Sequence, residues 1–130
     1  MKTILVDAVD AFVIETDHGF KIFKEMHNLL ESFPNKKIIL TGANDQQFKQ
    51  FGLDDMPYEV FTLKHDPEKT DPGYYKKLLK QFNLDPKDVV YFEHNPDAVK
   101  SAQSVGIKTY FYNHTISDLV ALQQFLKNNL

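Results

Sequence analysis

Cysteine and arginine are both absent from this chain of 130 residues. Without cysteine, the protein has no disulfide framework, no thiolate zinc site and no cysteine nucleophile. Without arginine, all fifteen cationic side chains are lysines. A phosphate or carboxylate group therefore cannot be held by a planar, two-pronged guanidinium, although a lysine ammonium can still act as a point charge.

The sequence also lacks a long hydrophobic run and an excess of positive charge. The apolar stretch near its N-terminus is interrupted by Asp7 and Asp10, whereas the hydrophobic region of a signal peptide is continuous. The net charge is −3 and the lysines are scattered, so there is no strong nucleic-acid signal. Hydrophobic residues make up 42% and charged residues 25%, as in ordinary globular proteins. We therefore expect a cytoplasmic protein that does not associate with membranes.

The length predicts one domain spanning residues 1–130. Short apolar segments alternate with amphipathic ones, which is typical of an α/β protein with a buried parallel sheet. The expected strands are 3–6, 37–41, 59–63, 88–92 and 107–111, and the expected helices are 22–33, 44–51, 71–82, 96–106 and 117–129, the last capped by Ser117. The segment 11–23 predicts a small hairpin around Asp17, His18 and Gly19.

Reactive side chains follow several of these strands. Asp7 and Thr41 end the first two, Glu93 and Asp97 follow the fourth, and Lys69 precedes the third long helix. Ligands of open parallel sheets bind outside the carboxyl ends of the strands, so we expect these groups to share one site. Carboxylates attract a divalent ion, whereas a hydroxyl and an ammonium group receive phosphoryl oxygens.

Four motifs in this order resemble the haloacid dehalogenase-like (HAD) superfamily over nearly the whole chain. "TILVD" resembles the strand that ends in a nucleophilic Asp, here Asp7, and "IILTGAN" the strand that ends in Thr41. "EKTDPGYY" resembles the third motif with Lys69, and "VVYFEHNPDAVKSAQSVGIKT" the fourth with Glu93 and Asp97. The resemblance implies a three-layer α/β/α Rossmann-like (HAD-like) fold with a parallel sheet of about five strands and no cap domain.

The resemblance also implies a Mg²⁺-dependent phosphatase. Asp7 would attack phosphorus and form an aspartyl-phosphate that water hydrolyses. The metal ligands would be Asp7, the carbonyl of Val9, and Glu93 or Asp97.

Phosphoryl oxygens would be held by Thr41, Gly42 and Lys69. Relatives without a cap act on macromolecules or close their sites with a neighbouring subunit. The implied substrate is therefore a phosphorylated small molecule or macromolecule, and a homo-oligomer is one implied arrangement.

The first motif departs from the phosphatase pattern, because Val9 stands where a second Asp protonates the leaving group. Asp10 lies one residue further on, and a spacing of three along an extended backbone directs it away from Asp7 unless the loop turns sharply. Whether Asp10 substitutes for the missing acid stays open. General acid–base catalysis contributes about 10²–10⁴-fold, so its loss would restrict turnover to substrates with good leaving groups. A catalytically degenerate binding or assembly module is therefore the alternative function.

Two segments of the sequence also resemble motifs of other proteins. "DAFV" resembles the opening of the true dehalogenases, with Asp10 as the nucleophile, but this would bury Asp7 within a strand at a cost of several kcal/mol. "DVVYFEHNPDA" resembles a strand of response-regulator receiver domains with Glu93 as phosphoacceptor, but only 33 residues follow Asp97. Among the five histidines, His65, His94 and His114 show no ligand spacing, and we expect these three at the surface.

Overall fold

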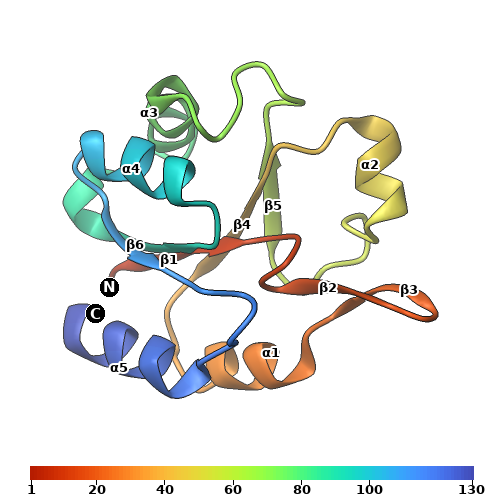
Figure 1. Ribbon diagram of the computed structural model, residues 1–130. Helices are drawn as coiled ribbons and strands as arrows, with labels where there is room; N and C mark the ends of the chain where they lie inside the picture. The colour runs from red at the N-terminus through yellow and green to blue at the C-terminus, as the bar shows by residue number, and fades with distance from the viewer.

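The computed structural model describes all 130 residues. Five parallel strands form one sheet in the order β5-β4-β1-β6-β7, and the helices pack on both of its faces (Figure 1). The strands are β1 (Thr3–Asp7), β4 (Lys37–Thr41), β5 (Glu59–Thr62), β6 (Val89–Glu93) and β7 (Lys108–Phe111). The helices are α1 (Lys24–Glu31), α2 (Asp45–Gln50), α3 (Pro72–Gln81), α4 (Pro96–Ser104) and α5 (Leu119–Asn129), with a 3₁₀ turn at Pro86–Asp88. The predicted three-layer α/β class is confirmed.

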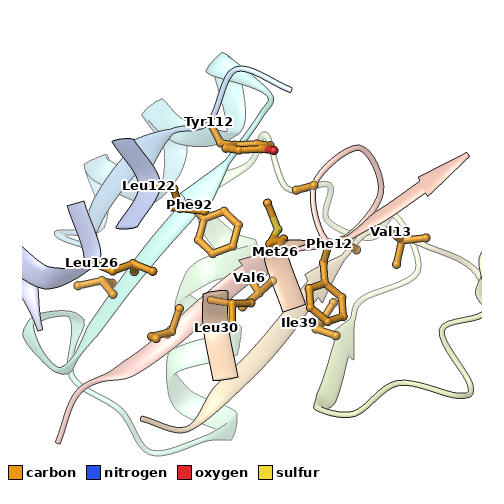
Figure 2. Packing of buried hydrophobic residues seen from close by; sticks show 14 of the residues in the cluster. Val6, Phe12, Val13, Met26, Leu30, Ile39, Phe92, Tyr112, Leu122 and Leu126 are labelled. Atoms are coloured by element: carbon orange, nitrogen blue, oxygen red, sulfur yellow. The ribbon is translucent and has the colours of Figure 1, made fainter. Parts of the chain in front are cut away.

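Alternate residues of the central strands divide the core into two layers. In β1, Ile4 and Val6 belong to a cluster shared with α1 and α5, whereas Leu5 belongs to the cluster beneath α3 and α4. Figure 2 shows the first cluster, in which Phe92 of β6 and Leu122 of α5 pack near Val6. Both faces of β1 and β6 are therefore apolar, which explains why these strands are continuous hydrophobic runs in the sequence.

The order of the strands fixes where a ligand can bind. From the central β1, the chain first adds β4 and β5 on one side and later β6 and β7 on the other. The reversal leaves a crevice at the carboxyl end of β1, between β4 and β6. In the register of the sheet, Asp7 pairs with Leu40 and Val6 with Phe92. Thr41 and Glu93 therefore end their strands on either side of Asp7.

The loops that could have carried a cap are short. Between β1 and α1 lies only an antiparallel hairpin, β2 (Val13–Thr16) and β3 (Gly19–Ile22), as the sequence predicts. Between β4 and α3 lie only α2, β5 and their connections. Neither segment forms a domain of its own. No helix is both long and apolar enough to span a lipid bilayer.

The starts of the first and last helices differ from the expectation. The helix predicted from residue 22 begins at Lys24, because Ile22 pairs with Val13 in the hairpin. The final helix is capped by Asp118, whose carboxylate accepts from the backbone N–H of Ala121 at 3.0 Å. Ser117 was the wrong cap, since its hydroxyl instead donates to the carbonyl of His114. A helix cap needs an acceptor three residues before the N–H that it satisfies, and Asp118 supplies it.

The two adjacent tyrosines of α3 give a matched test of the packing behind the crevice. Tyr74 and Tyr75 are both fully buried, but only the hydroxyl of Tyr74 has partners, the carbonyls of Thr41 at 2.7 Å and Phe61 at 3.3 Å. The Tyr75 hydroxyl has none. Tyr74→Phe should lower the free energy of unfolding by about 1–3 kcal/mol, because buried acceptors lose a donor. Tyr75→Phe should leave it unchanged or raise it, as urea denaturation would show; equal losses in the two variants would contradict this account.

Candidate active site

A polar cavity of about 250 Å³ opens at the carboxyl ends of β1, β4 and β6. Four loops converge there, each following one of the strands β1, β4, β5 and β6. The residues that bring charge or hydroxyl groups to its wall are Asp7, Thr41, His65, Glu68, Lys69, Thr70, Glu93 and His94. The cavity lies at the crevice that the strand order predicts.

Asp7, Lys69, Glu93 and His94 form an alternating charge cluster at the floor of this cavity. The ammonium of Lys69 donates to Asp7 Oδ1 at 2.8 Å and lies 2.6 Å from Glu93 Oε1. On the other side, His94 Nδ1 donates to Asp7 Oδ2 and lies 3.3 Å from Glu93 Oε2. The side chains of Asp7 and Glu93 are each only 1% exposed. Each carboxylate thus contacts both cations, and each cation contacts both carboxylates.

Further donors complete this cluster. The backbone N–H of His94 donates to Asp7 Oδ2 at 3.0 Å, and that of Asn95 donates to Glu93 Oε2 at 2.9 Å. The Tyr91 hydroxyl donates to Glu93 Oε1. The third acceptor of Lys69 is the carbonyl of Leu40 at 3.3 Å. Every carboxylate oxygen of the cluster therefore accepts at least one hydrogen bond.

The pKa values of the cluster follow from burial and from these contacts. Burial raises the pKa of the Asp7 carboxyl, and the nearby Glu93 carboxylate raises it further. Burial also raises the pKa of the Glu93 carboxyl, but the charge of Lys69 and the hydrogen bonds from His94, Lys69 and Tyr91 together outweigh it and hold this pKa well below its usual range. Hydrogen bonds to Asp7 and Glu93 raise the pKa of His94 to about 10. As the pH falls, Asp7 is therefore the first carboxylate of the cluster to take up a proton.

The structure brings together most of the residues that the four motifs single out. Asp7, Thr41, Gly42, Lys69 and Glu93 all line the cavity, and so does Val9, whose carbonyl was the predicted metal ligand. Asp97, the other predicted metal ligand, does not line it. It is exposed in the first turn of α4, where its backbone N–H donates to the side chain of Asn95.

Asp10 also lies outside the cavity lining, although its loop does turn sharply. The backbone N–H groups of Phe12 and Val13 donate back to the carbonyls of Asp7 and Ala8, and Asp10 has a φ of 73°. Its carboxylate is 49% exposed and lies 3.7 Å from Nε2 of His94. The carboxylate of Asp10 therefore contacts the ring nitrogen of His94 that is not bound to Asp7, and Asp10 does not line the cavity.

Two histidines that the sequence places at the surface line the cavity. His94 is only 24% exposed and contacts Asp7, so its expected surface position is wrong. His65 makes hydrogen bonds through Nδ1 to Glu68 at 3.1 Å and through Nε2 to Gln47 at 2.5 Å. The available signal for His94 was its place directly after a buried strand, beside Glu93.

The residues that follow Asp7 and Thr41 in the cavity wall include two whose backbone N–H groups have no partner within the chain. Those of Val9 and Gly42 donate no hydrogen bond, while the N–H of Ala43 is taken by the Thr41 hydroxyl at 3.1 Å. Unpaired N–H groups beside a lysine are typical of sites that receive an oxyanion. The cavity therefore offers donors to a phosphoryl group from two neighbouring loops.

Magnesium fits this donor set poorly. Mg²⁺ prefers oxygen ligands in an octahedral arrangement, and here the oxygens of Asp7 and Glu93 are already hydrogen-bonded to the chain. The third group within 4.8 Å of both carboxylates is the imidazole of His94, a ligand that suits zinc, copper or nickel rather than magnesium. Lys69 and the His94 imidazolium also balance the two negative charges. The residues as arranged do not fit Mg²⁺.

Comparison with known proteins gives the family and the fold. The model of the haloacid dehalogenase-like hydrolase family matches residues 5–112. No curated protein matches the chain. A HAD family enzyme from Bacteroides thetaiotaomicron, solved as a mutant with magnesium and inorganic phosphate, superposes with a TM-score of 0.71 at 14% identity, covering 88% of this chain and 95% of that one. An uncharacterized protein from Corynebacterium glutamicum gives 0.66 at 16% identity, covering 98% and 96%.

The chain belongs to the haloacid dehalogenase-like hydrolase family, since the family model covers most of its length and all the residues that line the cavity. The similar structures confirm the HAD Rossmann-like fold.

Lys69 should be the residue whose loss destabilises the cluster most. Its side chain is 15% exposed and pairs with two almost fully buried carboxylates. Lys69→Met should therefore cost about 3–5 kcal/mol of unfolding free energy, because it leaves buried negative charge uncompensated. Lys77→Met, at an exposed lysine of the adjacent helix, should stay within about 0.5 kcal/mol of the wild type. Urea denaturation of the three proteins checks this, and losses of equal size would contradict it.

The raised pKa of His94 predicts a pH-dependent contribution to stability. A group whose pKa rises on folding stabilises the folded state below its unfolded pKa, and the contribution is lost as the pH rises toward the folded value. For His94 this window runs from 6.5 to about 10. The difference in unfolding free energy between wild type and His94→Gln should therefore shrink between these pH values. Urea denaturation at several pH values measures it; a constant difference would show that His94 carries no excess charge in the folded state.

Proposed function

We propose that this chain is a phosphatase that acts through an aspartyl-phosphate on Asp7. The observation that supports this most is the position of Asp7 on the cavity floor, between Lys69 at 2.8 Å and the wall that carries the unpaired N–H groups of Val9 and Gly42. These groups and Thr41 would receive the phosphoryl oxygens. Lys69 would offset their negative charge as the phosphoryl group approaches the carboxylate.

The reaction has two displacements. An Asp7 oxygen attacks phosphorus while the bond to the leaving-group oxygen breaks, and water then attacks the aspartyl-phosphate to release inorganic phosphate and restore the carboxylate. Val9 offers no proton to the leaving group, and Asp10 lies outside the cavity lining. The leaving group therefore departs as an anion. Aryl or acyl phosphates, whose leaving groups are stable anions, are the favoured substrate class.

The Bacteroides enzyme is known in complexes with magnesium, as the wild type and as a mutant, so magnesium dependence is the expectation from family resemblance. In this chain, however, the carboxylate oxygens that would hold Mg²⁺ are already paired. No step of the proposed reaction passes through the metal.

A binding module without turnover is the second candidate, and the hydrogen bonds of Asp7 favour it. Lys69 holds one carboxylate oxygen, and the ring and backbone N–H groups of His94 hold the other. An oxygen that is held in this way is a weak nucleophile until a bond is released. The module would keep the oxyanion-binding groups of Val9, Gly42 and Thr41 but would not cleave its ligand.

Hydrolysis of p-nitrophenyl phosphate should separate the two candidates. The wild type should release nitrophenol, and Asp7→Asn should lose this activity to background, because an amide cannot form the aspartyl-phosphate. Asp54→Asn, at an exposed carboxylate remote from the cavity lining, should keep the wild-type rate. An unchanged rate in Asp7→Asn would exclude Asp7 as the nucleophile, whereas background in all three proteins would support the binding module.

A further inference from the structure

One nitrogen atom of His94 lies where a bridging cation would lie. Nδ1 contacts both Asp7 Oδ2 and Glu93 Oε2, which are the oxygens on the side of the cluster opposite Lys69. A divalent ion that bridged the two acids would need these same oxygens. The imidazole and such an ion therefore compete for one position.

Neighbouring groups hold the imidazole in that position. The backbone N–H of His94 and its ring both donate to Asp7. The next residue, Asn95, caps α4 with its side chain and donates its own N–H to Glu93. On the outer side, the ring of His114 packs against that of His94 edge-on, with 4.9 Å between centroids, and Asp10 lies 3.7 Å from Nε2. The ring is thus enclosed by the start of α4, by the loop that follows β7 and by the loop that follows β1.

We propose that the side chain of His94 replaces the divalent cation of this site, so that the chain binds phosphoryl groups without a metal. The inference rests on the proposed function only for the identity of the ligand. A bridging cation would hold the two acids together and offset their repulsion of an incoming phosphoryl group. The ring N–H of His94 on one side and the ammonium of Lys69 on the other hold the two acids together, and the charge of Lys69 offsets the repulsion.

The residue at position 94 should therefore decide whether the acid pair is bridged by a side chain or binds a divalent cation. His94→Asp removes the ring nitrogen that contacts both acids and adds a third carboxylate beside Asp7 and Glu93. Three hard oxygen donors with only Lys69 to balance them form a set that Mg²⁺ prefers. His114→Asp makes the same chemical change at an exposed histidine whose ring packs on His94, and it leaves the Asp7–Glu93 pair bridged.

Isothermal titration with MgCl₂ alone tests this in wild type, His94→Asp and His114→Asp, each checked for folding by circular dichroism. We expect Mg²⁺ binding only in His94→Asp. Binding of Mg²⁺ by the wild type with similar affinity would overturn the proposal. So would a folded His94→Asp variant that binds no Mg²⁺. If that variant does not fold, the wild-type titration decides alone.

A second titration uses inorganic phosphate, with EDTA or with excess MgCl₂. The wild-type affinity should not depend on the metal, whereas that of His94→Asp should rise by about tenfold or more, equivalent to about 1.4 kcal/mol, when Mg²⁺ is present. A tenfold rise in the wild type would overturn metal-independent binding. Absence of phosphate binding in every protein and condition would instead overturn the proposed function, and the titration with MgCl₂ alone would still decide the role of His94.

Discussion

Two buried carboxylates side by side at the edge of a parallel sheet are the constraint on which this structure depends. Asp7 and Glu93 end neighbouring strands, and both are removed from water. Burying one unpaired charge costs several kcal/mol, and like charges in one site raise that cost. The fold is therefore stable only if cations reach both acids. Lys69 comes from the loop after β5 and His94 from the residue after β6, so distant parts of the chain must close on the end of β1 together.

The same contacts link stability to reactivity. Asp7 is both the centre of the ion-pair cluster and the nucleophile of the proposed reaction, and each hydrogen bond that stabilises its carboxylate also lowers its nucleophilicity. Lys69 serves both purposes, because its charge stabilises the acids and attracts a phosphoryl group. His94 is different, since its ring and backbone N–H groups hold Asp7 Oδ2, the carboxylate oxygen that Lys69 leaves free. The balance between a slow enzyme and a binding module therefore depends on how readily Asp7 leaves His94.

The sequence predicts the fold well because the fold depends on patterns that repeat over many residues. Short apolar runs predicted the five strands, and the predicted helices 44–51 and 71–82 begin at Asn44 and Asp71, which cap them in the structure. The site was predicted in part, because the residues at strand ends meet wherever parallel strands share an edge. Asp10 was ambiguous, since its position depends on a backbone turn with positive φ that the sequence does not signal. His94 was missed, because a single histidine has no periodicity and its role arises only when Asp7 and Glu93 lie beside it.

The fold depends on patterns over many residues and the site on a few side chains, so the fold of this chain does not determine the chemistry of its site. The sheet and its helices are shared with proteins at 14–16% identity, so the architecture tolerates exchange at most positions. The chemistry of the crevice, by contrast, depends on a few side chains, and one nitrogen in place of one oxygen changes which cation the acid pair prefers. A fold alone does not assign an activity. In this chain, the group that contacts both Asp7 and Glu93 on the side opposite Lys69 is the His94 ring. The reactivity of Asp7 has to be derived from that contact rather than from the family.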